Sequence, residues 1–205
     1  AAGSVRVLTK GEPKESNTAL AQGGIAAVWA EVDSLGSHVA DTLEAGAWMA
    51  DPAVVEDILS DGRDAVQQLI DWGVEFSREV PGEADHTAND YHLTREGGHR
   101  ERRILHAADL TGAEIQRALL AATRAHPRIQ LLDRQVAIDL VTERKVARHK
   151  AKRRLGLDGP EAERRYGPSG PEGWMPDQRD RCLGAYVLDD RSGLVRLFSA
   201  SATLL

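Results

Sequence analysis

Cysteine is nearly missing from this sequence of 205 residues, in which Cys182 stands alone. A single cysteine excludes an internal disulfide, and no second cysteine or nearby histidine has the spacing of a metal ligand. The chain also lacks an apolar run long enough to span a bilayer. These absences predict a protein of the reducing cytoplasm, without a metal site and without a membrane partner.

An excess of positive charge is missing too, since 26 Lys and Arg residues face 32 Asp and Glu residues and leave a net charge of -6. Nucleic-acid-binding proteins usually carry a surplus of Lys and Arg that contacts phosphates. One basic run, 144–154, could form such a patch, but it contains no aromatic residues to stack on bases and acidic residues follow at once. We expect a solvated loop there and no nucleic-acid partner.

Helical periodicity of apolar residues is clear in three parts of the chain. These are 33–48, 52–72 and 111–125. Asp51 followed by Pro52 is a helix-start signal, and Gly62 could break the second helix in two.

Strands are expected between and after these helices. They fall at 5–8 and 73–76, as one or two strands over 129–141, in a hairpin that turns at 189–193, and as a further apolar strand toward Leu205. A polar loop is expected at 81–90. The segment 142–181 is basic and then rich in Pro and Gly without a periodic apolar face, which predicts an exposed insertion.

Both ends of the chain have the character of interior segments. The sequence opens on AAGSVRVLTK without a methionine and closes on the apolar stretch RLFSASATLL. We therefore expect an internal fragment of a longer protein, although a mature chain of this length is also conceivable.

A glycine pair interrupts the small-residue segment SNTALAQGGIAAV, residues 16–28. Gly23 and Gly24 carry no Cβ atom that would keep a ligand from the backbone, and they permit dihedral angles closed to other residues. The pair could equally form a turn between a strand and a helix, because turns use glycine for the same reason.

The densest group of titratable residues lies at 91–112, YHLTREGGHRERRILHAADLTG. It holds three histidines, a second glycine pair and many charges, with almost no periodicity before Ile104. Such a segment could be a charged surface loop joined to the helix at Thr111. Loops that carry function on a rigid scaffold have the same composition.

Three motifs, SNTALAQGGIAAV, HLTREGGH and RILHAADLTG, occur in this order. Together they resemble the L-aspartate oxidase family of flavoproteins, a branch of the succinate dehydrogenase and fumarate reductase flavoprotein superfamily. The resemblance implies an α/β fold, an FAD-binding dinucleotide-fold domain that is Rossmann-like and of the glutathione-reductase type. Residues 1–205 would form part of that domain, incomplete at both ends, with 142–181 as an exposed insertion and a β-hairpin near the C-terminus.

The resemblance also implies non-covalent FAD and a set of residues that hold it. Lys10 would lie near the adenosine, and Val136 would hold the adenine through main-chain groups. The ribityl chain, phosphates and flavin edge would lie against Asn17, Thr18, Ala21, Gln22, Gly23 and Gly24. The family's glycine-rich pyrophosphate loop and capping domain have no counterpart here, so we expect the fragment alone to be inactive.

A substrate residue is implied as well, since Glu96 corresponds to the glutamate that faces the α-ammonium group of aspartate. Dicarboxylate dehydrogenases and reductases carry an uncharged residue in that loop, and a carboxylate is the strongest acceptor for an ammonium group. His92, Thr94, His99 and His106 could shape the same pocket or simply pack within the loop.

The implied activity is oxidation of L-aspartate to iminoaspartate, with oxygen or fumarate as electron acceptor, in quinolinate and NAD biosynthesis. Quinolinate synthase is a possible partner. Two alternatives remain open: a fumarate reductase or succinate dehydrogenase subunit, which Glu96 disfavours, and a non-catalytic FAD-binding fragment.

Overall fold

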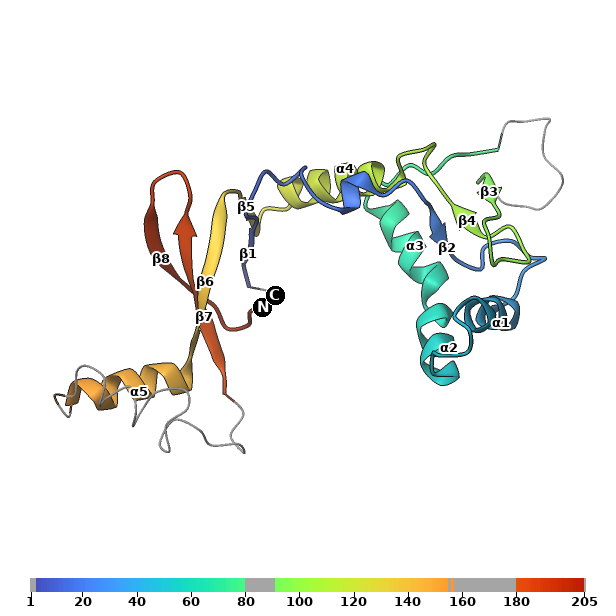
Figure 1. Cartoon of the computed structure of the whole chain (residues 1–205). Helices are drawn as coiled ribbons and strands as arrows, with labels where there is room; N and C mark the ends of the chain where they lie inside the picture. The colour runs from blue at the N-terminus through green and yellow to red at the C-terminus, as the bar shows by residue number, and fades with distance from the viewer. Residues whose placement is uncertain (1–2, 80–90, 155, 157–179, 205) are drawn as a thin grey trace. The chain divides into compact units, whose positions relative to one another are not determined.

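The computed structural model describes residues 3–79, 91–154, 156 and 180–204 (Figure 1). The loop expected at 81–90 and residues 157–179 of the expected insertion lie outside the described residues. The chain divides into two units. The first unit comprises Ala1–Arg6 and Pro13–Leu131, and the second comprises Val7–Glu12 and Leu132–Leu205.

A short strand pair joins the beginning of the chain to its middle. Strand β1 (Val5–Leu8) pairs with β5 (Ile129–Leu132). The Val5 amide donates to the Arg128 carbonyl at 2.8 Å and the Thr9 amide to the Leu132 carbonyl at 3.0 Å, so the partners advance together as in a parallel pair. The strand expected at 5–8 is confirmed.

The first unit is built around a small antiparallel sheet with helices (Figure 1). Its strands, in the order β2-β4-β3, are β2 (Ile25–Ala26), β4 (Ile104–Leu105) and β3 (Leu93–Thr94). Its helices are the 3-10 helix η1 (Thr18–Leu20), α1 (Leu35–Ala45), α2 (Pro52–Ser60), α3 (Gly62–Asp71) and α4 (Thr111–Ala125). The buried core includes Trp29, Val66, Phe76, Leu93 and Leu105.

The predicted helices are present, with two differences at their ends. The helix at 111–125 is confirmed in full, and the stretch 52–72 divides at Asp61, as Gly62 allowed. The helix predicted over 33–48 is shorter in the structure, where α1 spans Leu35–Ala45. Ser34 caps α1 by accepting the Ser37 amide, and the left-handed φ of 60° at Trp48 lies beyond the helix end.

The strand predicted at 73–76 is wrong. Val74 and Phe76 are buried as a strand's apolar residues would be, but the segment joins no sheet. Its amides are used elsewhere: Val74 donates to the Leu69 carbonyl at 3.0 Å, and Glu75 donates to the Glu114 carboxylate at 2.8 Å. The amides of Val74 and Glu75 are therefore hydrogen-bonded to groups of helices α3 and α4, and they need no strand partner.

The second unit contains an antiparallel sheet in the order β6-β7-β8, with strands β6 (Gln135–Thr142), β7 (Cys182–Asp189) and β8 (Leu194–Ser199). One or two strands were expected over 129–141, and the structure has two, β5 and β6. The hairpin turn expected at 189–193 is confirmed. The apolar strand expected toward Leu205 is wrong, since β8 ends at Ser199 and Leu204 is 99% exposed.

Helix α5 (Glu143–Arg154) follows β6 (Figure 1). A solvated loop was predicted there because the segment lacks an apolar face. Its Lys, Arg and Ala residues are nevertheless strong helix formers, and Glu143 places a negative charge at the helix start. Helix propensity therefore decides the local structure where burial does not.

Two glycines of the first unit are required by close backbone contacts. A Cβ atom on Gly24 would lie 2.3 Å from the Leu105 carbonyl oxygen, and one on Gly112 would lie 1.8 Å from the Thr18 carbonyl oxygen. Gly24 thus lets β2 approach β4, and Gly112 lets the start of α4 lie against η1. Gly23, next to Gly24, has no atom within 4 Å of its Cβ position.

Substitution of Gly24 by alanine should lower the free energy of unfolding by about 1–3 kcal/mol, because the methyl group overlaps β4. Gly23→Ala is the matched control and should change it by less than about 0.5 kcal/mol. Thermal unfolding of the two apoprotein variants provides the comparison. Equal midpoints would contradict the close contact at Gly24.

Candidate functional site

The TREGGH loop (residues 94–99) connects β3 to the segment that leads into β4. Its turn is closed by the His99 amide, which donates to the Glu96 carbonyl at 3.3 Å. Gly98 has a φ of 84°, a left-handed value that favours glycine. Glu96 is exposed, and its carboxylate forms no hydrogen bond or ion pair with the other described residues.

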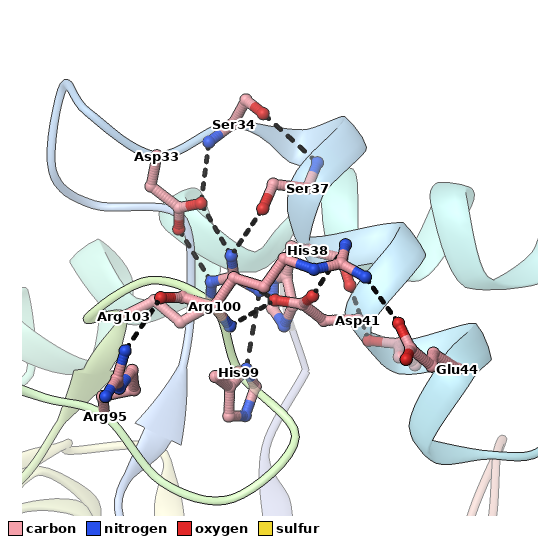
Figure 2. Close-up of polar contacts among 11 residues, drawn as sticks. Asp33, Ser34, Ser37, His38, Asp41, Glu44, Arg95, His99, Arg100 and Arg103 are labelled. Carbon is pink, nitrogen blue, oxygen red and sulfur yellow. Dashed lines mark hydrogen bonds and ion pairs between the residues drawn. The ribbon is translucent and has the colours of Figure 1, made fainter.

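A buried arginine, Arg103, follows this loop in the chain and bonds residues of α1 and of the segment before it (Figure 2). Arg103 is 0% exposed and bonds Asp33 through two parallel contacts of 2.8 Å, Nε to Oδ2 and Nη2 to Oδ1. Its Nη1 donates to Asp41 Oδ2 at 2.8 Å, and its Nη2 donates to Ser37 Oγ at 3.1 Å. One guanidinium therefore ties the segment before α1, helix α1 itself and the approach to β4 into one cluster.

Asp41 joins a second arginine to the same cluster (Figure 2). Its Oδ2 also accepts from the Arg100 backbone amide at 2.9 Å, and its Oδ1 pairs with Arg100 Nη1 at 3.1 Å. Burial opposes ionisation of Asp41, but the Arg100 amide and the charges of Arg103 and Arg100 outweigh it and hold the pKa of this carboxyl below its usual value. Asp41 is therefore a buried carboxylate whose charge is matched within the cluster.

His38 contacts this cluster from helix α1. It is 2% exposed, its ring centroid is 5.7 Å from that of His99, and its Nδ1 has no hydrogen-bond partner among the residues that the structure describes. Burial and then the positive charge of Arg103 lower the pKa of His38, with a further lowering by His99, and this outweighs the opposing effect of Asp33 and Asp41. The ring is neutral in the folded protein near neutral pH.

His92 and His106 form a second histidine pair, at the edge of the β3–β4 ladder. His92 Nδ1 lies 2.7 Å from His106 Nε2, and His106 Nδ1 lies 3.3 Å from the Ala108 carbonyl oxygen. Because a carbonyl only accepts, His106 Nδ1 carries a hydrogen, and in the singly protonated tautomer of His106 its Nε2 accepts from His92 Nδ1–H. Thr94 lies in β3, opposite Ile104.

The residues expected at the flavin fall into both units. In the first unit, the segment around η1 rests on α4, where the Gly112 amide donates to the Ala21 carbonyl at 3.0 Å. Five residues of this segment are exposed, namely Asn17, Thr18, Ala21, Gln22 and Gly23. The Asn17 side chain does not cap η1. The open space over Gly23 fits a group that lies on this backbone, whereas β4 occupies the corresponding space at Gly24.

The other two expected cofactor residues meet in the second unit. The Thr9 carbonyl accepts from the Gln135 amide at 2.9 Å, which brings their chain neighbours Lys10 and Val136 together. Lys10 is exposed, and Val136 pairs with Leu188 of β7. Strand β6 lies at the edge of its sheet, so the main chain on its other side is not used by the ladder. This arrangement suits main-chain contacts to a ligand beside Lys10.

The cluster around the buried Arg103 contains residues that sequence reasoning missed: Asp33, Ser37, His38, Asp41, Arg100 and Arg103. The run HRERR was visible as a charged segment, but Arg103 and Asp33 are 70 positions apart. No periodicity or spacing connects residues at that separation. Within the described ranges, no three His, Cys, Asp or Glu side chains gather as metal ligands would, and no helix combines the length and apolarity of a membrane span.

The chain matches the FAD binding domain family over residues 1–205 and belongs to that family. The expected FAD-binding α/β fold and its FAD cofactor are thereby confirmed. The L-aspartate oxidase of Pseudomonas aeruginosa is 43% identical over 201 residues, which cover 98% of this chain and 32% of that protein. The L-aspartate oxidase of Vibrio cholerae is 51% identical over 144 residues, or 70% of this chain and 26% of that protein. The chain therefore spans about a third of the length of the Pseudomonas relative.

Solved structures of related flavoproteins share the fold. A mutant of the E. coli quinol fumarate reductase has a TM-score of 0.61 and 29% identity over 68% of this chain and 23% of that one. A quinol-fumarate reductase with menaquinol molecules has a TM-score of 0.69 over 96% of this chain and 27% of that one. At 23% identity, the second likeness concerns the fold alone.

Stability should fall as the pH drops, in part because of His38. The unfolded chain takes up a proton near the ordinary pKa of 6.5, whereas the folded protein resists it, so folding free energy is lost as the pH falls through that value. In His38→Gln, the fall in thermal midpoint between about pH 7.5 and about pH 5.5 should be smaller than in the unsubstituted protein. Because the other histidines are common to both proteins, identical pH profiles would refute the role of His38.

Proposed function

We propose that the protein is an FAD-dependent L-aspartate oxidase that converts L-aspartate to iminoaspartate. The observation that carries the proposal is the carboxylate of Glu96, which is exposed and has no hydrogen-bond or ion-pair partner among the described residues. Around it, the charges of Asp41, Arg100 and Arg103 are matched by one another and by neighbouring carboxylates. Glu96 therefore remains available to an external cation such as the α-ammonium group of aspartate. Likeness to curated L-aspartate oxidases supports the same substrate.

The residues of this chain would bind and orient the substrate. When bound, FAD supplies the acceptor for the hydride that leaves the aspartate Cα. Glu96 would hold the ammonium group, and the neighbouring His92, Thr94 and His99 would shape the pocket. Correct orientation of the Cα–H bond is the main contribution that a protein makes to such a step.

The cofactor residues are proposed in two groups, according to the contacts described above. Exposed groups at the η1 segment, Asn17, Thr18, Ala21, Gln22 and Gly23, would line the phosphates, ribityl chain and flavin edge. Gly24 would support them by allowing β2 to approach β4. In the second unit, Lys10 and Val136 would lie at the adenosine.

The proposed reaction also implies an electron acceptor, a pathway, a location and a partner. We propose oxygen or fumarate as electron acceptor, a place in quinolinate and NAD biosynthesis, and a cytoplasmic location. Quinolinate synthase would be the partner that receives iminoaspartate. Residues 1–205 would form part of the FAD-binding domain, with 142–181 as an exposed insertion that begins with helix α5.

A fumarate reductase is the second candidate, because solved fumarate reductases share the fold. Its dicarboxylate substrate carries no ammonium group, so an unpaired Glu96 would repel it. The carboxylate thus favours aspartate over succinate as the compound oxidised.

Replacement of Glu96 by glutamine tests this role. The side chain keeps its shape but exchanges a charge-assisted hydrogen bond for a neutral one, so the KM for aspartate should rise about 10- to 100-fold. The kcat should change less, because the contact is present both before and during hydride transfer. Fumarate binding should hold steady or tighten, since a nearby negative charge is removed.

Steady-state kinetics with aspartate and with fumarate provide the measurement on the whole protein. Glu56→Gln, on the exposed side of α2, makes the same change in net charge and should alter neither KM. Parallel losses for both ligands in Glu96→Gln would show that Glu96 serves only the loop structure.

Flavin should be bound without a covalent bond. Flavoproteins of the superfamily that hold FAD covalently do so through a histidine between Ser and Thr, and Asn17 occupies that position in Ser16-Asn17-Thr18. An amide is not alkylated by the flavin. Acid precipitation of the holoprotein should release all the flavin into the supernatant, and flavin fluorescence on the denatured polypeptide would contradict this.

A further inference from the structure

We propose that Asp41 is a positioning residue for Glu96, through the contacts it makes with Arg100 and Arg103. The inference rests on the proposed role of Glu96 in binding the substrate ammonium group. Asp41 itself does not bind substrate, because its side chain is 2% exposed and both of its oxygens are engaged.

The TREGGH loop has one firm end and one end that depends on Asp41. Thr94 is held in the ladder by its pairing with Ile104. At the other end, the Arg100 backbone amide donates to Asp41 Oδ2 at 2.9 Å. Between these anchors lie Gly97 and Gly98, the residues with the greatest backbone freedom. The position of Glu96 therefore depends on both ends being fixed.

Asp41 is in turn held by the buried Arg103 (Figure 2). Arg103 Nη1 donates to Asp41 Oδ2 at 2.8 Å while the same guanidinium is held by Asp33. Gly98 lies against the end of α1, with its Cβ position 3.4 Å from the Ala45 Cβ atom. The loop is thus seated on α1 through a carboxylate that cannot move independently of the core.

Glu44 offers a matched comparison. It pairs with the Nη2 atom of the same Arg100, but its side chain is 65% exposed and it contacts neither the Arg100 amide nor Arg103. If an ion pair with Arg100 were sufficient, Glu44 and Asp41 would matter equally. If the buried anchor matters, only Asp41 will affect Glu96.

The test is a double-mutant cycle of Asp41→Asn with Glu96→Gln in the holoprotein, with the KM and kcat for L-aspartate and the KM for fumarate as readouts. In asparagine, an NH2 group replaces one oxygen and faces donors of Arg100 or Arg103. Asp41→Asn should raise the KM for aspartate about tenfold in the native background and less than about twofold in the Glu96→Gln background. Fumarate KM and FAD content should be unchanged, and Glu44→Gln should alter no value more than about twofold.

The outcomes separate this proposal from the function on which it rests. An equal rise of the aspartate KM in both backgrounds, or a parallel rise for fumarate, overturns the positioning role alone. No effect of Glu96→Gln on aspartate overturns the proposed function and this inference with it. If Asp41→Asn does not fold, Asp41→Glu keeps the charge that faces Arg103 but moves the carboxylate relative to the Arg100 amide. It should raise the aspartate KM in the native background only, and no rise, or an equal rise in both backgrounds, overturns the proposal.

Discussion

The buried guanidinium of Arg103 is the interaction on which the first unit depends. A charge with no solvent exposure is stable only when it is paired and fully hydrogen-bonded. Arg103 meets this requirement through Asp33, Asp41 and Ser37, and these partners fix how α1 lies against the segment leading to β4. Loss of one partner of such a group typically costs about 3–5 kcal/mol, because the remaining charge is left buried and uncompensated.

The charges of this cluster are paired with one another, in contrast to the proposed substrate contact Glu96. Carboxylates that face arginines are neutralised within the cluster, while Glu96 extends from a glycine-containing loop without a partner among the described residues. A similar separation holds for the two adjacent glycines. Gly24 meets a packing requirement of β4, whereas Gly23 leaves open space above the backbone. Of these two neighbours, Gly24 therefore serves the packing of β2 on β4, and Gly23 is the one with room for the proposed cofactor contact.

Local patterns predicted those elements whose stability is largely local or whose apolar residues face one core. Helix α4 agrees with its predicted range because its apolar periodicity has clear limits, and the hairpin of β7 and β8 because its turn residues lie between two apolar runs. The same reasoning wrongly predicted a strand at 73–76. The apolar residues of this segment are buried, but its amides bond helix α3 and Glu114. Burial alone does not make a strand without a neighbouring edge.

The sequence by itself determined the FAD-binding family, helices α1 to α4, strand β1, the β7–β8 hairpin, and the residue types at the candidate site. These follow from motifs and from the spacing of apolar residues over a few positions, because the periods of helices and strands are set by local chain geometry. Only the tertiary structure decided that Arg103 pairs with Asp33 and Asp41, which lie 70 and 62 positions away. Such pairs depend on how separate elements pack, because a side chain selects its partner by distance in space and not along the chain.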